Sequence, residues 1–183
     1  MSIWARKSPR RFKNKIVIPT EYDLADPRRV ELIERHNARV MERKRRLHEA
    51  RMARKAENLK AMEGVKVGDI FTLSWGYDQT NLDFFQVVAL VGKSSVRVRP
   101  VAPEIVSEEP GMMCAHRTYK FPQDGTLLPP LTRSVFIENC LKGDTKRVQA
   151  GVRDGDAPFI KLGSHYAQKE MNPTARHYES WYA

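Results

Sequence analysis

The chain has 183 residues, 41% of them hydrophobic, and a formal net charge of +10 at pH 7. This length fits one domain with an extension or two small domains. No run of eighteen or more apolar residues exists, and the N-terminus lacks an apolar segment of the signal-peptide type, so we expect neither a transmembrane helix nor a secretory leader. Cys114 and Cys140 are not spaced as metal ligands, and two reduced thiols in a cytoplasmic protein are expected, with a disulfide between them as the alternative.

The positive charge is concentrated towards the N-terminus. Residues 1–63 contain 18 Lys and Arg against 9 Asp and Glu, a difference of +9, whereas residues 64–183 contain 14 against 13, a difference of +1. A basic block joined to a near-neutral globular part is typical of nucleic-acid-binding proteins, because phosphate contacts supply much of their affinity. The alternative is a solvated basic segment that only keeps the protein soluble.

Residues 1–25 form a basic arm in this interpretation, with six Lys and Arg between positions 6 and 15. The Ile-Val-Ile sequence at 16–18 predicts a short strand or an anchor that docks on the globular body.

Residues 26–63 predict one long helix. Asp26 is a favourable N-cap and Pro27 a favourable first helical residue, and the next Gly or Pro is Gly64, which suits the C′ position. Strong helix formers fill the interval. The apolar stripe is thin, so the helix is expected to pack through its first turns and its last turn, leaving the middle exposed.

The middle of this helix is rich in arginine and carries cations on most of its faces, as nucleic-acid-binding helices do. The alternative is a solvated helix stabilised by Glu–Arg pairs at i,i+4. The candidate nucleic-acid contacts on the helix are Arg43, Lys44, Arg45, Arg46, Arg51, Arg54 and Lys55.

Residues 64–183 predict a small antiparallel β domain of the barrel-like, SH3-like type, with an aromatic C-terminal tail that packs back on it. The fold class is therefore predicted as α+β. The alternation in 95–101 places Val96 and Val98 inside and Arg97 and Arg99 outside, where the two arginines are further candidate contacts. Strands are expected at 65–73, 84–91, 95–101, 112–121, 134–141, 147–152 and 159–162, and the acidic stretch 104–111 is expected to be a loop.

Between the first two of these strands lies Trp-Gly-Tyr-Asp-Gln-Thr-Asn-Leu-Asp, at 75–83. A hairpin needs only two to five turn residues, so this segment has more hydrogen-bonding side chains than a turn requires and is a candidate site. Tyr77 would stack on an unpaired base, with Gln79 and Asn81 reading base edges. The alternative is a long turn whose polar side chains bond their own backbone, with the neighbouring aromatics filling the core.

Residues 68–88 resemble a family of small proteins from bacteriophages and mobile elements. The likeness is carried by Gly-Asp-Ile at 68–70, then Ser-Trp-Gly-Tyr-Asp-Gln-Thr-Asn, then Asp-Phe-Phe-Gln-Val-Val, which ends at 88. Phe85 stands where that family usually has tyrosine. The likeness is close over 65–101 and looser over 145–183, and it does not include the basic arm and helix. The resemblance implies a viral or mobile-element setting, in which small proteins often act on host defence or host nucleic-acid machinery.

Two enzymatic interpretations compete with binding. A metal-dependent nuclease needs neighbouring carboxylates, for which Asp78 and Asp83 are candidates together with Asp69. A metal-free ribonuclease would use His116 as general acid or base beside Lys120, which lies on the same face of its strand. No Cys or His spacing predicts a metal site, and no cofactor is expected.

The sequence thus predicts an accessory protein of a phage or mobile element, located in the host cytoplasm, which binds RNA, DNA or a host ribonucleoprotein through the basic helix, with the loop 76–83 contributing. Inhibition of a host defence system such as a CRISPR effector is the role suggested by this setting. A basic protein would not imitate DNA, but would engage guide RNA or keep DNA out. The alternatives are a small RNase or DNase acting at the loop, and a structural or adaptor protein that docks through the helix. The oligomeric state stays open.

Overall fold

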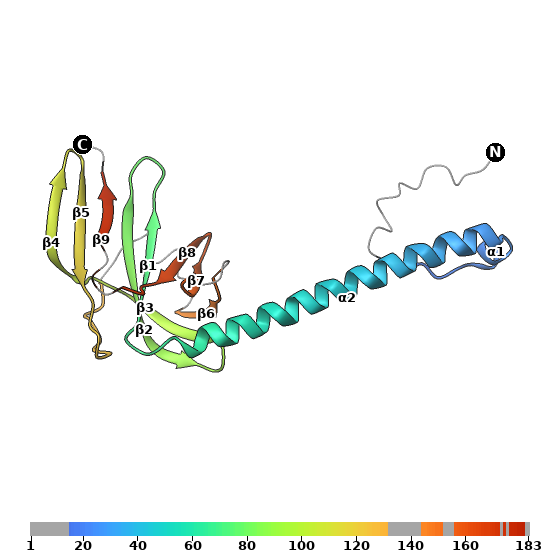
Figure 1. The fold of residues 1–183 in the computed structure, drawn as a ribbon, viewed down its shortest axis with the longest axis horizontal. Coiled ribbons are helices and arrows are strands. Elements are labelled where there is room, and N and C mark those ends of the chain that lie inside the picture. The colour runs from blue at the N-terminus through green and yellow to red at the C-terminus, as the bar shows by residue number, and fades with distance from the viewer. Residues whose placement is uncertain (1–14, 132–143, 152–155, 173, 175, 182–183) are drawn as a thin grey trace. The chain divides into compact units, whose positions relative to one another are not determined.

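The computed structural model describes residues 15–131, 144–151, 156–172, 174 and 176–181 (Figure 1). The chain divides into two compact units, Met1–Arg54 and Lys55–Ala183, and each is described by itself. Most of the predicted basic arm, the predicted strand 134–141 and Cys140 lie outside the described residues.

The first unit begins its regular structure with a short helix, α1 (Glu21–Leu24), inside the segment expected to be an arm. Thr20 and Asp23 form a reciprocal cap: the Thr20 Oγ1 accepts the Asp23 N–H at 3.3 Å, and the Asp23 carboxylate accepts the Thr20 N–H at 3.1 Å. This is the capping box that satisfies backbone N–H groups at a helix start. The arm therefore includes one helical turn that composition did not indicate.

The long helix, α2 (Pro27–Glu63), confirms the predicted extent. Asp26 caps it as expected, because its Oδ1 accepts the Arg28 N–H at 3.0 Å. Gly64 follows the helix, but its φ does not lie in the left-handed region, so the helix does not end in the C′ glycine geometry.

The chain before α1 lies along α2 and is joined to it by side-chain hydrogen bonds. The Asn37 amide accepts the Val17 N–H at 2.8 Å and donates to the Val17 carbonyl at 2.7 Å. His36 Nε2 lies 3.0 Å from the carbonyl oxygen of Lys15. A polar residue on the apolar seam of the helix thus binds the backbone of the predicted anchor, which docks on α2.

The second unit is built on a closed antiparallel barrel with the order β1-β2-β3-β6-β7-β8. Residues 95–99 alternate inward apolar and outward polar side chains, as a half-exposed strand does, whereas residues 84–87 are all buried. Met62, in the last turn of α2, packs into the barrel core as expected. The strands are β1 (Ile70–Trp75), β2 (Asn81–Val91), β3 (Ser95–Val101), β6 (Thr145–Gln149), β7 (Phe159–Leu162) and β8 (His165–Lys169). The core includes Phe71, Leu73, Phe85, Val87, Val96, Val98, Val148, Ile160, Leu162 and Ala167.

A second, three-stranded sheet in the order β4-β5-β9 lies beside the barrel (Figure 1). Its strands are β4 (Glu104–Gly111), β5 (Cys114–Lys120) and β9 (Arg176–Ser180). The expectation of a loop at 104–111 was wrong, since every residue of β4 is exposed but its backbone pairs with β5. Phe84 and Tyr119 pack between sheet and barrel with ring centroids 4.6 Å apart.

A buried glutamine joins the barrel to the loop that follows β5. Gln86 is fully buried, and its amide donates to the carbonyls of Gly68 at 3.1 Å and Thr126 at 2.8 Å. Its Oε1 accepts the Leu128 N–H at 2.8 Å. Each hydrogen bond satisfies a polar group that burial would otherwise penalise.

The helices and strands together confirm the predicted α+β class, with a long helix and an antiparallel barrel-like domain.

Candidate nucleic-acid interface and hairpin loop

The middle of α2 is exposed around its whole circumference. Every residue from 43 to 53 is exposed, a stretch of three turns or about 16 Å of helix. Residues 43–55 contain seven Lys and Arg against one carboxylate, Glu49. The sequence prediction that this part of the helix does not pack is confirmed.

Glutamates neutralise part of the charge of two of these cations, Arg45 and Arg46. The Glu42 carboxylate lies 2.8 Å from Arg46 Nε and 2.9 Å from an Arg45 guanidinium nitrogen, and Glu49 lies 3.9 Å from Arg45. Hydrogen bonds from Arg46 and then Arg45 hold the pKa of Glu42 below its ordinary value. The side of the helix that carries Glu42 and Glu49 is therefore partly neutralised.

Four of the other cations share another side of the helix. At about 100° per residue, Arg43, Lys44, Arg51 and Arg54 fall within an arc of about 100°. Lys44 and Arg51 make no ion pair with any residue that the structure describes. We call these four residues the cationic stripe. The expectation that the cations cover most faces of the helix is thus refined, and Lys55 follows the stripe as a further exposed cation.

The β1–β2 hairpin has a shorter loop than predicted. Trp75 pairs with Asn81 in the register, so the loop is 76–80, and Asn81 and Asp83 belong to β2. Gly76 has φ +128°, and a Cβ there would come within 1.8 Å of the Gln79 carbonyl oxygen, so only glycine fits. Thr80 exchanges two backbone hydrogen bonds with Ser180 of β9, at 3.2 and 3.0 Å. The hairpin tip is therefore tied to the second sheet.

Asp83 makes a structural contact beside the hairpin loop. Trp75 Nε1 donates to Asp83 Oδ2 at 2.6 Å, and Trp75 packs against the barrel core. Partial burial raises the pKa of Asp83, and the hydrogen bond from Trp75 opposes this only in part. We call this contact the Trp75–Asp83 latch. It favours the structural interpretation of these two residues, which the sequence left open.

The other loop residues remain accessible. Tyr77 is fully exposed, and Asp78 and Gln79 are exposed beside it. The Gln79 amide donates to Asn81 Oδ1 at 3.4 Å, and Asn81 Nδ2 is buried with no hydrogen bond to a described residue. Asn81 therefore faces the inside of the loop, whereas base stacking at Tyr77 stays a prediction.

The two arginines of β3 differ in exposure and in their partners. Arg97 is exposed and lies 3.0 Å from the Asp144 carboxylate. Arg99 is partly buried and donates to the Leu128 carbonyl at 2.6 Å. Both arginines lie on the outward face of the strand as predicted, but Arg99 is not an accessible contact residue, because the loop after β5 covers that part of the barrel.

The catalytic candidates lie on different parts of the second unit. Asp78 is on the exposed hairpin loop, Asp83 is held in the latch, and His116 is exposed on β5 with its ring 5.1 Å from that of Tyr178. No hydrogen bond or ion pair among described residues joins the three. Within the described ranges, no three His, Cys, Asp or Glu side chains converge as a metal site would require.

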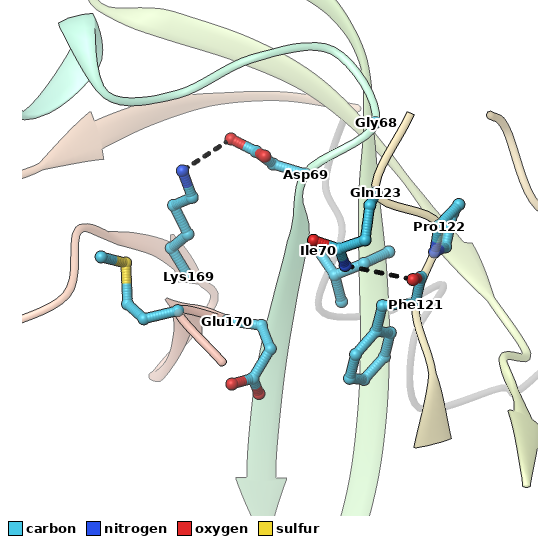
Figure 2. A pocket seen from close by; sticks show the side chains of 9 residues that line it. Gly68, Asp69, Ile70, Phe121, Pro122, Gln123, Lys169 and Glu170 are labelled. Carbon is cyan, nitrogen blue, oxygen red and sulfur yellow. Dashed lines mark hydrogen bonds and ion pairs between the residues drawn. The ribbon is translucent and has the colours of Figure 1, made fainter. Parts of the chain in front are cut away.

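A polar pocket of about 220 Å³ opens between β1, the start of the loop after β5 and the end of β8 (Figure 2). Asp69 and Lys169 face each other across it at 2.8 Å, and Asp69 also accepts the Lys66 N–H at 2.7 Å. Burial alone would raise the pKa of Glu170, but the contact with His177 and further hydrogen bonds hold it below its ordinary value. The charged groups that line the pocket are therefore already paired within the protein, which does not favour it as a ligand site.

No protein-family model, curated protein or solved structure matches this chain. In the part of the chain that the structure describes, no helix is both long enough and apolar enough to cross a membrane.

Proposed function

We propose that the protein binds nucleic acid through the cationic stripe of α2. One observation supports this most directly: Lys44 and Arg51 share one side of a fully exposed helical stretch, and neither is neutralised by a described carboxylate. Exposed Lys and Arg release counterions when they contact phosphates, which is the main source of non-specific affinity. A ribonucleoprotein would be bound by the same contacts with its RNA.

The setting remains part of this proposal. The resemblance to phage and mobile-element proteins favours an accessory role in an infected host cell, including inhibition of a host defence system such as a CRISPR effector. The SH3-like type of the barrel and the cytoplasmic location likewise stay predictions of the sequence.

The rival enzymatic interpretation has less support from the geometry. Asp83 accepts a hydrogen bond from Trp75 and its pKa is raised, so it is a poor partner for Asp78 in metal binding. The adaptor interpretation is compatible with the exposed helix, and the binding experiment separates it from the proposal.

The test is binding of labelled single- and double-stranded RNA and DNA over a salt series, with a denaturing gel to detect cleavage. For B-DNA each lost phosphate contact reduces the slope of log K against log salt by about 0.9, so Lys44→Gln/Arg51→Gln should reduce it by about 2. The matched control is Lys66→Gln/Lys93→Gln, which removes the same charge from two exposed lysines of the second unit. Equal losses for both variants would contradict the stripe, and no binding at low salt would favour a protein partner for α2.

A further inference from the structure

The cations of α2 are arranged for a groove with phosphates on both walls. We propose that residues 43–54 enter the major groove of double-stranded DNA, an inference that rests on the proposed nucleic-acid binding and names its substrate.

The first argument is steric. A helical stretch can enter a groove only where no neighbouring part of the protein encloses it, and residues 43–53 are exposed on every side of α2. An α-helix with side chains is about 10–12 Å across, and the major groove of B-DNA is about 12 Å wide. The stretch of about 16 Å would follow roughly five base pairs at about 3.4 Å each.

The second argument is the angular distribution of charge. With Arg43 as the origin and about 100° per residue, Lys44 lies at about 100°, Arg51 at about 80° and Arg46 at about 300°. The arc from Arg46 to Lys44 spans about 160°, with Arg54 near its centre at about 20°. Lys44 and Arg51 therefore stand on one flank of this half of the helix, and Arg46, which is paired with Glu42, stands on the other flank. Each flank can contact one phosphate backbone.

Between residues 42 and 54, both carboxylates lie on the opposite half of the helix. On the same scale Glu49 lies at about 240°, Glu42 at about 260° and Arg45 at about 200°. Both carboxylates would thus face away from the groove floor when the cationic half faces the DNA. A helix that only attracted a flexible single strand would need no such separation.

The centre of the cationic half would face the base edges. Arg43 and Arg54 lie there with the small side chain of Ala50, which is at about 340°. Arginine bonds the O6 and N7 of guanine in the major groove, and alanine contacts the thymine methyl group. Duplex RNA is a poorer fit, because its A-form major groove is deep and narrow.

The experiment compares the full-length protein on duplex DNA, single-stranded DNA, duplex RNA and single-stranded RNA of one sequence, about 24 nucleotides long, by fluorescence anisotropy. A fifth probe is the same duplex DNA with glucosylated 5-hydroxymethylcytosine, whose sugar fills the major groove. We expect duplex DNA to bind at least about tenfold more tightly than the other four probes. Occupying the minor groove with netropsin should leave the affinity for duplex DNA within about twofold of its value without netropsin.

Arg45 and Arg46 supply a matched pair of variants, because both bond to Glu42 but lie on different sides of the helix. Arg46→Gln should weaken duplex binding at least about threefold more than Arg45→Gln. Circular dichroism checks that both variants keep the helix.

Two results would overturn the groove assignment while leaving the proposed function intact: equal affinity for single strands and duplex DNA, or binding that ignores the glucosylated bases. Equal effects of the two arginine variants would also contradict it. Failure to bind any of the five probes at low salt would remove both the proposed function and this inference.

Discussion

Replacement of Asp83 separates a structural carboxylate from a catalytic one. Asp83→Ala leaves the Trp75 indole N–H without its acceptor at 2.6 Å, and a partly buried donor without a partner costs about 1–3 kcal/mol. Asp83→Asn keeps an acceptor oxygen and removes the charge. Because the pKa of Asp83 is raised, the folded site favours the neutral carboxyl over the carboxylate. We therefore expect the free energy of unfolding of Asp83→Asn to differ from that of the wild type by no more than about 0.5 kcal/mol at neutral pH.

The raised pKa also sets the sign of a pH effect. The folded protein holds the Asp83 proton more tightly than the unfolded chain does, so this group stabilises the fold as the pH decreases from 7 through its raised pKa. The gain in stability is complete once the pH falls to the ordinary aspartate pKa of 3.8, and it is lost again as the pH increases through the raised pKa. Other carboxyl groups titrate in the same range, so the quantity to compare is the difference between the wild type and Asp83→Asn.

The assay is urea denaturation followed by tryptophan fluorescence at about pH 7 and about pH 4.5. The wild type should gain stability relative to the Asn variant at the lower pH. Trp75→Phe, alone and with Asp83→Ala, completes a double-mutant cycle with an expected coupling of about 1 kcal/mol. Two results would contradict the latch: Asp83→Asn destabilises the protein as much as Asp83→Ala, or the stability difference between the wild type and Asp83→Asn does not change with pH. Either result would make a functional role the better interpretation of the Asp83 carboxylate.

Four further substitutions, one of them a control, test the fold. Gly76→Ala should lower the free energy of unfolding by about 2 kcal/mol or more, because of its positive φ and the nearby Gln79 carbonyl oxygen. Gly92→Ala is the control: its φ is +62°, but the space around it is open, so it should cost only about 1–2 kcal/mol. Both are measured in denaturation experiments. Gln86→Leu should cost about 2–4 kcal/mol by the same assay, since three hydrogen bonds are lost and their buried partners remain. Asn37→Leu should release the segment before α1, measured as faster amide exchange at residue 17 with the circular dichroism of α2 unchanged.

Local signals in the sequence predicted those elements whose stability comes from neighbours in the chain. Asp26 and Pro27 mark the start of α2, and no Gly or Pro interrupts it before residue 64, so its extent follows from capping and propensity. The alternation around Val96 and Val98 likewise specifies which face of β3 is buried.

Features that depend on distant partners were missed or misread. The stretch 104–111 is acidic and fully exposed, and only its pairing with β5 makes it a strand. Arg99 alternates correctly along β3, but the loop that covers it comes from residues near 128, about thirty positions later. Asp83 was counted in the loop because its strand register with Leu73 cannot be read from composition. The ion pairs of Glu42 with Arg45 and Arg46 were partly foreseen, since Glu–Arg pairs at i,i+4 are local.

The two candidate sites differ in how far the protein satisfies their polar groups itself. In the hairpin, Asp83 accepts a hydrogen bond from the Trp75 indole and the Thr80 backbone pairs with β9, so part of the hydrogen-bonding capacity of this segment is used within the fold, whereas Tyr77 and Asp78 stay exposed. In α2, two carboxylates neutralise one side, whereas Lys44 and Arg51 have no ion pair with a described residue. A group that folding leaves unpaired in a specific arrangement is one that binding can still use, and on that ground the helix is the better place to look for the partner.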